Sequence, residues 1–224
     1  MSSNPYEVWP QGTGGLTTAE ITISTIRPAS YNGCKIDLRV EPVEDSGGHM
    51  HDGARPHGRI TPSTITIPAC TMGISTVTYT SSEVSGEEGI IAEVNGQRVG
   101  EAMVNVRVPR LVALGGGDTY RLTGGTSTHP NNHYGTPETN ARIRAMARDY
   151  FEATGIAIGI NDMSLPLGGL FDIYGNWSPP HKLHRLGKSV DVDHLGVKEK
   201  RLNKIAEKYS CKRLEVERIH YECP

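Results

Sequence analysis

The sequence predicts two domains, an all-β sandwich followed by an α+β domain. Two observations indicate this order. Short runs rich in Thr, Ile and Val fill the first half of the chain, whereas segments with helical spacing appear only after Pro109. A chain of 224 residues can also bury two cores of ordinary size. We expect a flexible segment over residues 1–16, the sandwich over 17–110 and the second domain over 111–224.

Six runs in the first half alternate apolar and polar residues, and clusters of Gly, Pro, Ser and Asn separate them. This pattern is typical of antiparallel strands with one buried face. The runs are AEITISTI, KIDLRVE, STITI, STVTYT, GIIAEV and AMVNVRV. Between the last two, Asn95 and Gly96 favour the two positive φ angles of a type I′ hairpin turn. The first domain is therefore expected to be immunoglobulin-like in general character.

The second half contains a helix with signals at both ends. Thr136 is a typical N-cap, Pro137 suits the first helical position and Gly155 suits the position just past the end. The apolar side chains that share one face of this helix are Ile143, Met146, Ala147 and Tyr150. VKEKRLNKIAEKYS predicts a second amphipathic helix, and GIAIGIN, KSVDVDH and KRLEVERIHYE predict strands. We expect a small antiparallel sheet backed by the two helices.

Residues 180–194, PHKLHRLGKSVDVDH, contain three His and two Asp. Zinc binds His nitrogen and carboxylate oxygen, and a catalytic zinc takes three protein ligands and leaves one position for water. His184 and Asp191 are a plausible first pair, because Gly187 allows a tight turn between them. His220 is the expected third ligand, since neighbouring antiparallel strands can present side chains to one point. The small sheet would thus carry a zinc site.

Two other residues compete for places in this site. His194 is the alternative to His220 as a ligand. Asp193 shares a strand face with Asp191, and we expect it to orient a ligand His or to face solvent rather than to bind the metal itself. The alternative for the whole stretch is a surface loop in which the same side chains cap a turn and form ordinary ion pairs.

Glu217 lies three residues before His220, in a Glu-x-x-His pattern. A metal-bound water becomes a nucleophile near neutral pH when a carboxylate beside the metal accepts its proton. Glu217 is therefore the expected general base. Residues three apart on an ideal strand point to opposite faces, so a bulge or bend is expected between these two residues.

The order of His184, six residues, Asp191 and a late His220 resembles the zinc peptidase superfamily of lysostaphin-type enzymes, D-alanyl-D-alanine peptidases and hedgehog signalling domains. The resemblance covers the C-terminal half only. In the D-Ala-D-Ala dipeptidase and carboxypeptidase branch, a Glu three positions before the last His is the catalytic base, which implies that role for Glu217.

The penicillin-insensitive murein endopeptidases are similar in two further motifs. They have a His three residues before the first ligand, where this chain has His181, and an approach segment similar to NDMSLPLGG. The resemblance implies that His181 contacts substrate or the developing oxyanion, and Arg185 is the alternative group that would steady the oxyanion.

The function implied by the resemblance is zinc-dependent hydrolysis of an amide bond in a small peptide or a peptidoglycan stem peptide, by a D,D- or L,D-type carboxypeptidase or endopeptidase. The opening residues MSSNPYEVWPQGTGG contain no apolar signal region, so the sequence itself indicates no location. An extracellular or cell-envelope location is expected from the suspected substrate alone. The alternative is a non-catalytic zinc-containing binding module that recognises the cell wall or a protein partner. A structural adhesin fragment without bound metal is the third possibility.

Charge and hydropathy exclude two classes of partner. With 23 Lys+Arg against 25 Asp+Glu spread along the chain, no basic face is expected for nucleic acid. No run approaches the roughly 20 apolar residues of a membrane span. If the cysteines form disulfides, the pairing that keeps each bond within one domain is Cys34 with Cys70 and Cys211 with Cys223. The alternative is that they are buried free thiols. The oligomeric state is left open.

His49 and His51, with His57 nearby, form another group of histidines. They are either a second metal site or part of a polar loop between strands, and we favour the loop because only Asp52 is a fixed partner. Residues 129–135, HPNNHYG, either line the cleft or lead into the helix.

Three aromatic residues in the segment 168–177 either wall the cleft or seal a small core, and core packing is the commoner fate of such side chains. They are Phe171, Tyr174 and Trp177.

Overall fold

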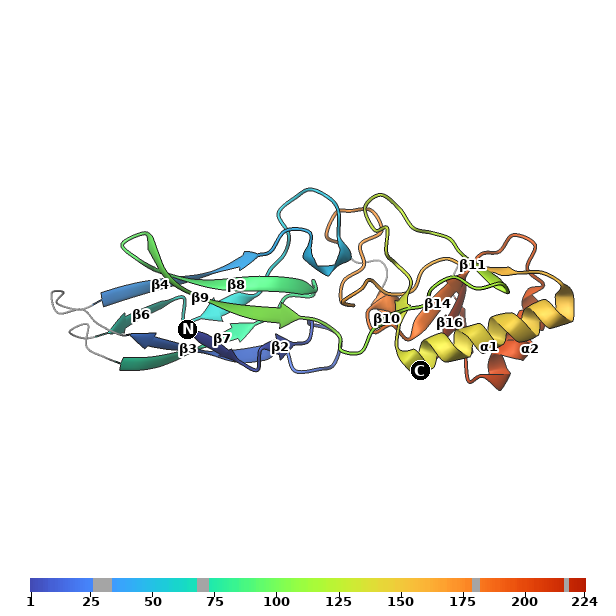
Figure 1. Cartoon of the computed structure of the whole chain (residues 1–224), viewed down its shortest axis with the longest axis horizontal. Coiled ribbons are helices and arrows are strands. Elements are labelled where there is room, and N and C mark those ends of the chain that lie inside the picture. The colour runs from blue at the N-terminus through green and yellow to red at the C-terminus, as the bar shows by residue number, and fades with distance from the viewer. Residues whose placement is uncertain (26–33, 68–72, 179–181, 216–217) are drawn as a thin grey trace. The chain divides into compact units, whose positions relative to one another are not determined.

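A computed structural model of the chain (Figure 1) describes residues 1–25, 34–67, 73–178, 182–215 and 218–224. The chain divides into two compact units. The first comprises Met1–Ser46 and Ala54–Arg107, and the second comprises Gly47–Gly53 and Val108–Pro224. The predicted sandwich, 17–110, includes residues 47–53, which the structure instead groups with the second unit.

The first unit consists of two β-sheets whose apolar faces contribute to one core. Its strands are β1 (Ser2–Asn4), β2 (Glu7–Val8), β3 (Thr18–Thr25), β4 (Cys34–Pro42), β5 (Arg59–Thr61), β6 (Thr64–Ile67), β7 (Gly73–Thr80), β8 (Gly86–Val94) and β9 (Gln97–Val106). The sheet orders are β1-β3-β7-β5 and β2-β9-β8-β4-β6. The turn between β8 and β9 has φ angles of 51° at Asn95 and 76° at Gly96, which confirms the predicted hairpin. This β-rich arrangement is compatible with an immunoglobulin-like sandwich.

The N-terminal segment differs from the flexible stretch predicted for residues 1–16. Strand β1 pairs with β3, and β2 pairs with β9 in the parallel direction. The backbone amides of Asn105 and Arg107 also donate to the carbonyls of Tyr6 and Val8, at 2.9 and 2.8 Å. These strands are too short to show alternation in the sequence, and their order comes from partners far along the chain.

The second unit contains a five-stranded sheet of order β11-β13-β14-β16-β15 and a two-stranded sheet of β10 and β12. The strands are β10 (Val112–Ala113), β11 (Tyr120–Leu122), β12 (Tyr134–Gly135), β13 (Ile158–Ile160), β14 (Ser189–Val192), β15 (Lys212–Glu215) and β16 (Ile219–Glu222). The expectation of a wholly antiparallel sheet is wrong at one edge, where β11 and β13 run parallel. Parallel neighbours need a crossover connection, and the first helix of this unit provides it.

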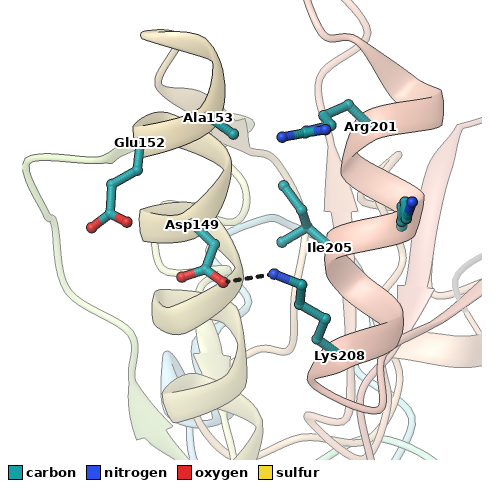
Figure 2. A pocket seen from close by; sticks show the side chains of 7 residues that line it. Asp149, Glu152, Ala153, Arg201, Ile205 and Lys208 are labelled. Atoms are coloured by element: carbon teal, nitrogen blue, oxygen red, sulfur yellow. Dashed lines mark ion pairs between the residues drawn. The ribbon is translucent and has the colours of Figure 1, made fainter.

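That helix, α1 (Pro137–Thr154), has the predicted ends. The side chain of Thr136 accepts a hydrogen bond from the backbone of Thr139, and Gly155 closes the helix at φ 70°. The second helix is α2 (Glu199–Lys208), and apolar side chains of both helices and of the sheet form one core. Figure 2 shows side chains of both helices that line a pocket, and Lys208 pairs there with Asp149 at 3.6 Å. The described helices include none that is long and apolar enough to cross a membrane.

The chain end forms a hairpin rather than the single strand predicted from KRLEVERIHYE. Strands β15 and β16 pair antiparallel, so β16 lies between β14 and β15. A Cys211–Cys223 disulfide joins the residues that flank this hairpin. Of the other predicted pair, Cys70 lies outside the described residues.

Candidate metal centre

The central strands β14 and β16 direct alternate side chains to the two faces of the sheet. Val190 and Tyr221 are buried in the core shared with α1 and α2. Because side chains alternate along a strand, Asp191 and His220 point to the other face. They lie directly opposite each other in the strand register, which brings their side chains within reach of each other.

His184 reaches the same place from η3 (Lys182–His184), a short 3-10 turn before β14. The chain then turns at Gly187, whose φ is 63° and whose amide donates to the His184 carbonyl at 3.1 Å. A Cβ at Gly187 would lie 2.5 Å from the side chain of Leu111 and 3.0 Å from the backbone of Gly135. Only glycine fits this turn without displacing its neighbours.

His184, Asp191 and His220, which we call the His184 cluster, each offer a ligand atom within 4.8 Å of the others. His220 Nδ1 lies 2.6 Å from Asp191 Oδ1, and His184 Nε2 lies 3.5 Å from Asp191 Oδ2. The two imidazole rings are 5.0 Å apart. All three residues are buried, with exposed fractions of 1, 3 and 2%. The side chains that the sequence singled out therefore lie together, in a donor set that suits zinc.

Asp191 is held in its ionised form. Burial acts to raise the pKa of this carboxyl, but the hydrogen bonds with His184 and His220 outweigh burial and hold the pKa below its ordinary value. The cluster therefore offers a carboxylate between two imidazoles, a set of ligands that a divalent cation such as zinc can bind.

A further buried carboxylate, Asp162, lies beside the His184 cluster. Its carbonyl accepts a hydrogen bond from the Asp191 amide at 2.8 Å, and its carboxylate accepts one from Asn132 Nδ2 at 2.7 Å. Arg218 pairs with it at 3.5 Å. Burial raises the pKa of Asp162, against the lowering effect of the nearby His184.

A pocket of about 300 Å³ opens beside this carboxylate. Its lining combines charged, aromatic and small side chains and comprises Gly124, Thr126, His129, Asn161, Asp162, Phe171, Ile173 and Arg218. Asp162 was not among the residues predicted for the site, although a carboxylate directly after the apolar run GIAIGIN was a usable signal.

The structure describes only some of the other residues predicted for the site or as alternatives to it. Glu217 and His181 lie outside the described residues. Arg185 is buried, and its carbonyl accepts a hydrogen bond from Gly169 at 3.0 Å. His194 is exposed and lies outside the described cluster. Asp193 accepts a hydrogen bond from the Thr123 hydroxyl at 2.9 Å.

A second group of ligand-type side chains lies in the same unit. His49, His51, His129 and Asp172, which we call the His49 cluster, also place their ligand atoms within 4.8 Å of one another. His49 and His51 lie in the predicted loop between strands, but Asp172 and His129 lie beside them, so Asp52 is not the only partner within reach. His57 is not part of the cluster and contacts the Gly58 carbonyl at 2.7 Å.

The charges of the His49 cluster complement one another. Burial lowers the pKa of His49, which keeps the imidazole neutral. Burial also acts to raise the pKa of Asp172, but hydrogen bonds with His129 and His49 hold it below its ordinary value. Neutral imidazole and ionised carboxylate are the forms in which these side chains bind metals.

The aromatic segment 168–177 and the segment 129–135 meet at the two clusters. The ring of Phe171 is buried and lies 5.3 Å from the ring of His129 and 6.3 Å from that of His184. The ring of Trp177 lies 4.3 Å from that of His51 at a tilt of 48°, whereas Tyr174 is exposed. Core packing thus holds for Phe171 but not for Tyr174.

The chain matches no protein-family model and no curated protein.

Proposed function

We propose that this protein is a zinc metallopeptidase that hydrolyses an amide bond in a small peptide or a peptidoglycan stem peptide. The single observation that carries the proposal is the convergence of His184, Asp191 and His220 on one face of the sheet. Three nitrogen and oxygen ligands leave a fourth position for water, as catalytic zinc sites do. A pocket of about 300 Å³ beside Asp162 gives room for part of a peptide.

The roles of the chain's own groups are suggested by this ligand set and, for Glu217 and His181, by the resemblance to zinc peptidases. Zinc, when bound, supplies a Lewis acid that polarises the scissile carbonyl and acidifies water. Glu217, three residues before His220 in the sequence, would accept a proton from the attacking water and pass it to the leaving amine. His181 or Arg185 steadies the negative charge on the carbonyl oxygen. Arg218, which lines the pocket, is suited to pair with a substrate carboxylate.

A second candidate is a non-catalytic zinc-containing module that binds the cell wall or a protein partner. The observation that favours it is the burial of all three ligands, none of which is more than 3% exposed. Structural metal sites are buried in this way, whereas a catalytic metal must be reached by substrate.

Glu217→Gln separates the two candidates. For a metallopeptidase, we expect unchanged zinc content and a loss of cleavage of about 10²–10⁴-fold, because the proton acceptor is removed and the ligands are kept. Zinc is measured by elemental analysis, and cleavage by mass spectrometry of digested peptidoglycan and of D- and L-peptides.

The matched control is Glu222→Gln, an exposed residue of β16, which should retain both properties. A wild-type protein that holds zinc at the His184 cluster but cleaves none of these substrates would support the binding module instead.

A further inference from the structure

We propose that the His49 cluster is a second metal site, which binds one zinc-type divalent cation through four protein ligands and fastens the segment Gly47–Gly53 within the second unit. The second site shares no ligand with the His184 cluster, although His129 also lines the pocket beside Asp162.

The four side chains direct one atom each toward a common point. His49 Nδ1 lies 3.0 Å from Asp172 Oδ1, 3.1 Å from His129 Nε2 and 3.4 Å from His51 Nε2. Asp172 is also 3.1 Å from His129 Nε2, through Oδ1, and 3.4 Å from His51 Nε2, through Oδ2. The four groups thus surround a small central volume.

Hydrogen bonds alone do not satisfy this arrangement. An imidazole nitrogen carries either one proton or one lone pair in the plane of its ring. His49 Nδ1 has three polar neighbours within 3.4 Å, so it can form a good hydrogen bond with only one of them. Its other nitrogen, Nε2, is buried and has no hydrogen-bond partner in the described part of the chain. A cation at the common point would accept lone pairs from all four side chains at once.

The spacing of the ligand atoms fits a tetrahedral zinc site. Zinc–nitrogen distances of about 2.0–2.1 Å place neighbouring ligand atoms about 3.3 Å apart. The distances from His49 Nδ1 to the other three ligand atoms, and from Asp172 Oδ1 to His129 Nε2, range from 3.0 to 3.4 Å. Three imidazoles and one carboxylate also suit zinc and neighbouring transition metals, whereas magnesium and calcium prefer oxygen ligands.

The site is closed, as structural metal sites are. His49, His129 and Asp172 are 4, 1 and 0% exposed. The ring of Trp177 covers both His49 and His51, at 4.8 and 4.3 Å, and its amide donates to Asp172 Oδ2 at 2.5 Å. Four protein ligands leave no position for substrate, so a structural role follows.

The two clusters form separate mononuclear sites. The ring of Phe171 neighbours one histidine of each cluster, at 5.3 Å from the ring of His129 and 6.3 Å from that of His184. Phe171 also lines the pocket beside Asp162. A metal that orders Asp172 would therefore also order the neighbouring wall of this pocket.

The consequence of the second site is a cross-link between distant segments. His49 and His129 are 80 positions apart in the chain. Besides the cluster, the Met50 amide ties the segment to the Thr128 carbonyl at 2.8 Å. Binding of a metal that requires the folded geometry stabilises that geometry.

The test is metal stoichiometry on the full chain, stripped with a chelator and reloaded with Zn²⁺ alone. We expect two equivalents in the wild type, one in His51→Gln and one in His220→Ala. His57→Gln is the matched control and should keep both, because His57 lies outside the cluster. Co²⁺ in His220→Ala should give the intense visible absorption of a tetrahedral site.

The pattern of metal loss among the variants distinguishes failure of the second site from failure of the hydrolase site. A wild type with one equivalent that His220→Ala removes and His51→Gln retains would overturn the second site and leave the hydrolase proposal intact. The reverse pattern would overturn the ligand set of the hydrolase alone, and no uptake would overturn both.

A second readout covers the case in which His51→Gln does not fold. In the wild type, zinc should slow hydrogen exchange of the Met50 amide by at least about tenfold, because local opening then requires loss of the metal. Exchange that is the same with and without zinc would refute the second site.

Discussion

Asp191 is the residue that joins the two imidazoles of the His184 cluster. Its strand position opposite His220 follows from the register of β14 and β16, and its contact with His184 follows from the turn at Gly187. Its lowered pKa means that it offers a full negative charge to a cation at neutral pH. An amide of the same shape offers only a weak ligand oxygen.

Asp191→Asn should therefore abolish zinc binding at the His184 cluster while the fold persists. Asp193→Asn is the matched control, since Asp193 is on the same strand extension and bonds to Thr123 instead. Circular dichroism checks the fold, and elemental analysis counts the metal. Retention of full zinc by Asp191→Asn in a His51→Gln background would show that Asp191 is not a ligand.

At the scale of elements, strand β8 carries a buried carboxylate into the sandwich. Glu88 is fully buried, and its Oε2 accepts hydrogen bonds from Tyr79 at 2.7 Å and from the Gly58 amide at 2.8 Å. Burial raises the pKa of Glu88, and the hydrogen bonds and the charge of Arg55 oppose this only in part. The folded state therefore binds this proton more tightly than the unfolded state does.

The free energy of unfolding of the first unit should fall as pH rises from the ordinary carboxyl pKa to the raised pKa of Glu88, because the folded state holds more protons in that interval. Glu88→Gln should remove this part of the slope. Denaturant unfolding from about pH 4 to 8 measures it. Its exposed neighbour in β8 gives the control Glu87→Gln. Equal slopes in the two variants would contradict the assignment.

Local signals predicted the elements where each signal is complete within a few residues. Thr136, Pro137 and Gly155 marked the ends of α1, and Asn95-Gly96 marked the turn between β8 and β9. The hairpin of β15 and β16 was missed because its residues read as one continuous strand. The parallel edge strand β11 was missed because three residues carry no periodicity.

At the scale of the whole molecule, each unit has its own hydrophobic core. The His184 cluster and the His49 cluster both belong to the second unit. Ligand binding stabilises only the cooperative unit that contains the site.

Calorimetry of the wild type should therefore resolve two unfolding transitions, and a chelator should lower only one. Free zinc at a hundred times its dissociation constant should raise the free energy of unfolding of the second unit by about 2.7 kcal/mol. The fluorescence of Trp177 in Trp9→Phe should follow the transition that moves, because the two tryptophans lie in different units. A single transition, or two that both shift, would contradict independent units.

A site could be predicted from the sequence only where its residues lie close together in the chain or on neighbouring predicted strands. His184 and Asp191 are close in sequence, and His220 lies on a neighbouring strand. The sequence pattern was therefore enough to predict that these three side chains lie together. His49 and Asp172 come from distant segments, and nothing local to either residue indicates the other. Their juxtaposition arises from the tertiary fold alone.

The most direct measurement is anomalous scattering at the zinc absorption edge from crystals grown with zinc. We predict a peak about 2.0–2.2 Å from one atom each of His184, Asp191 and His220. A map with no peak between these three side chains, even if the His49 cluster is occupied, would contradict the central claim.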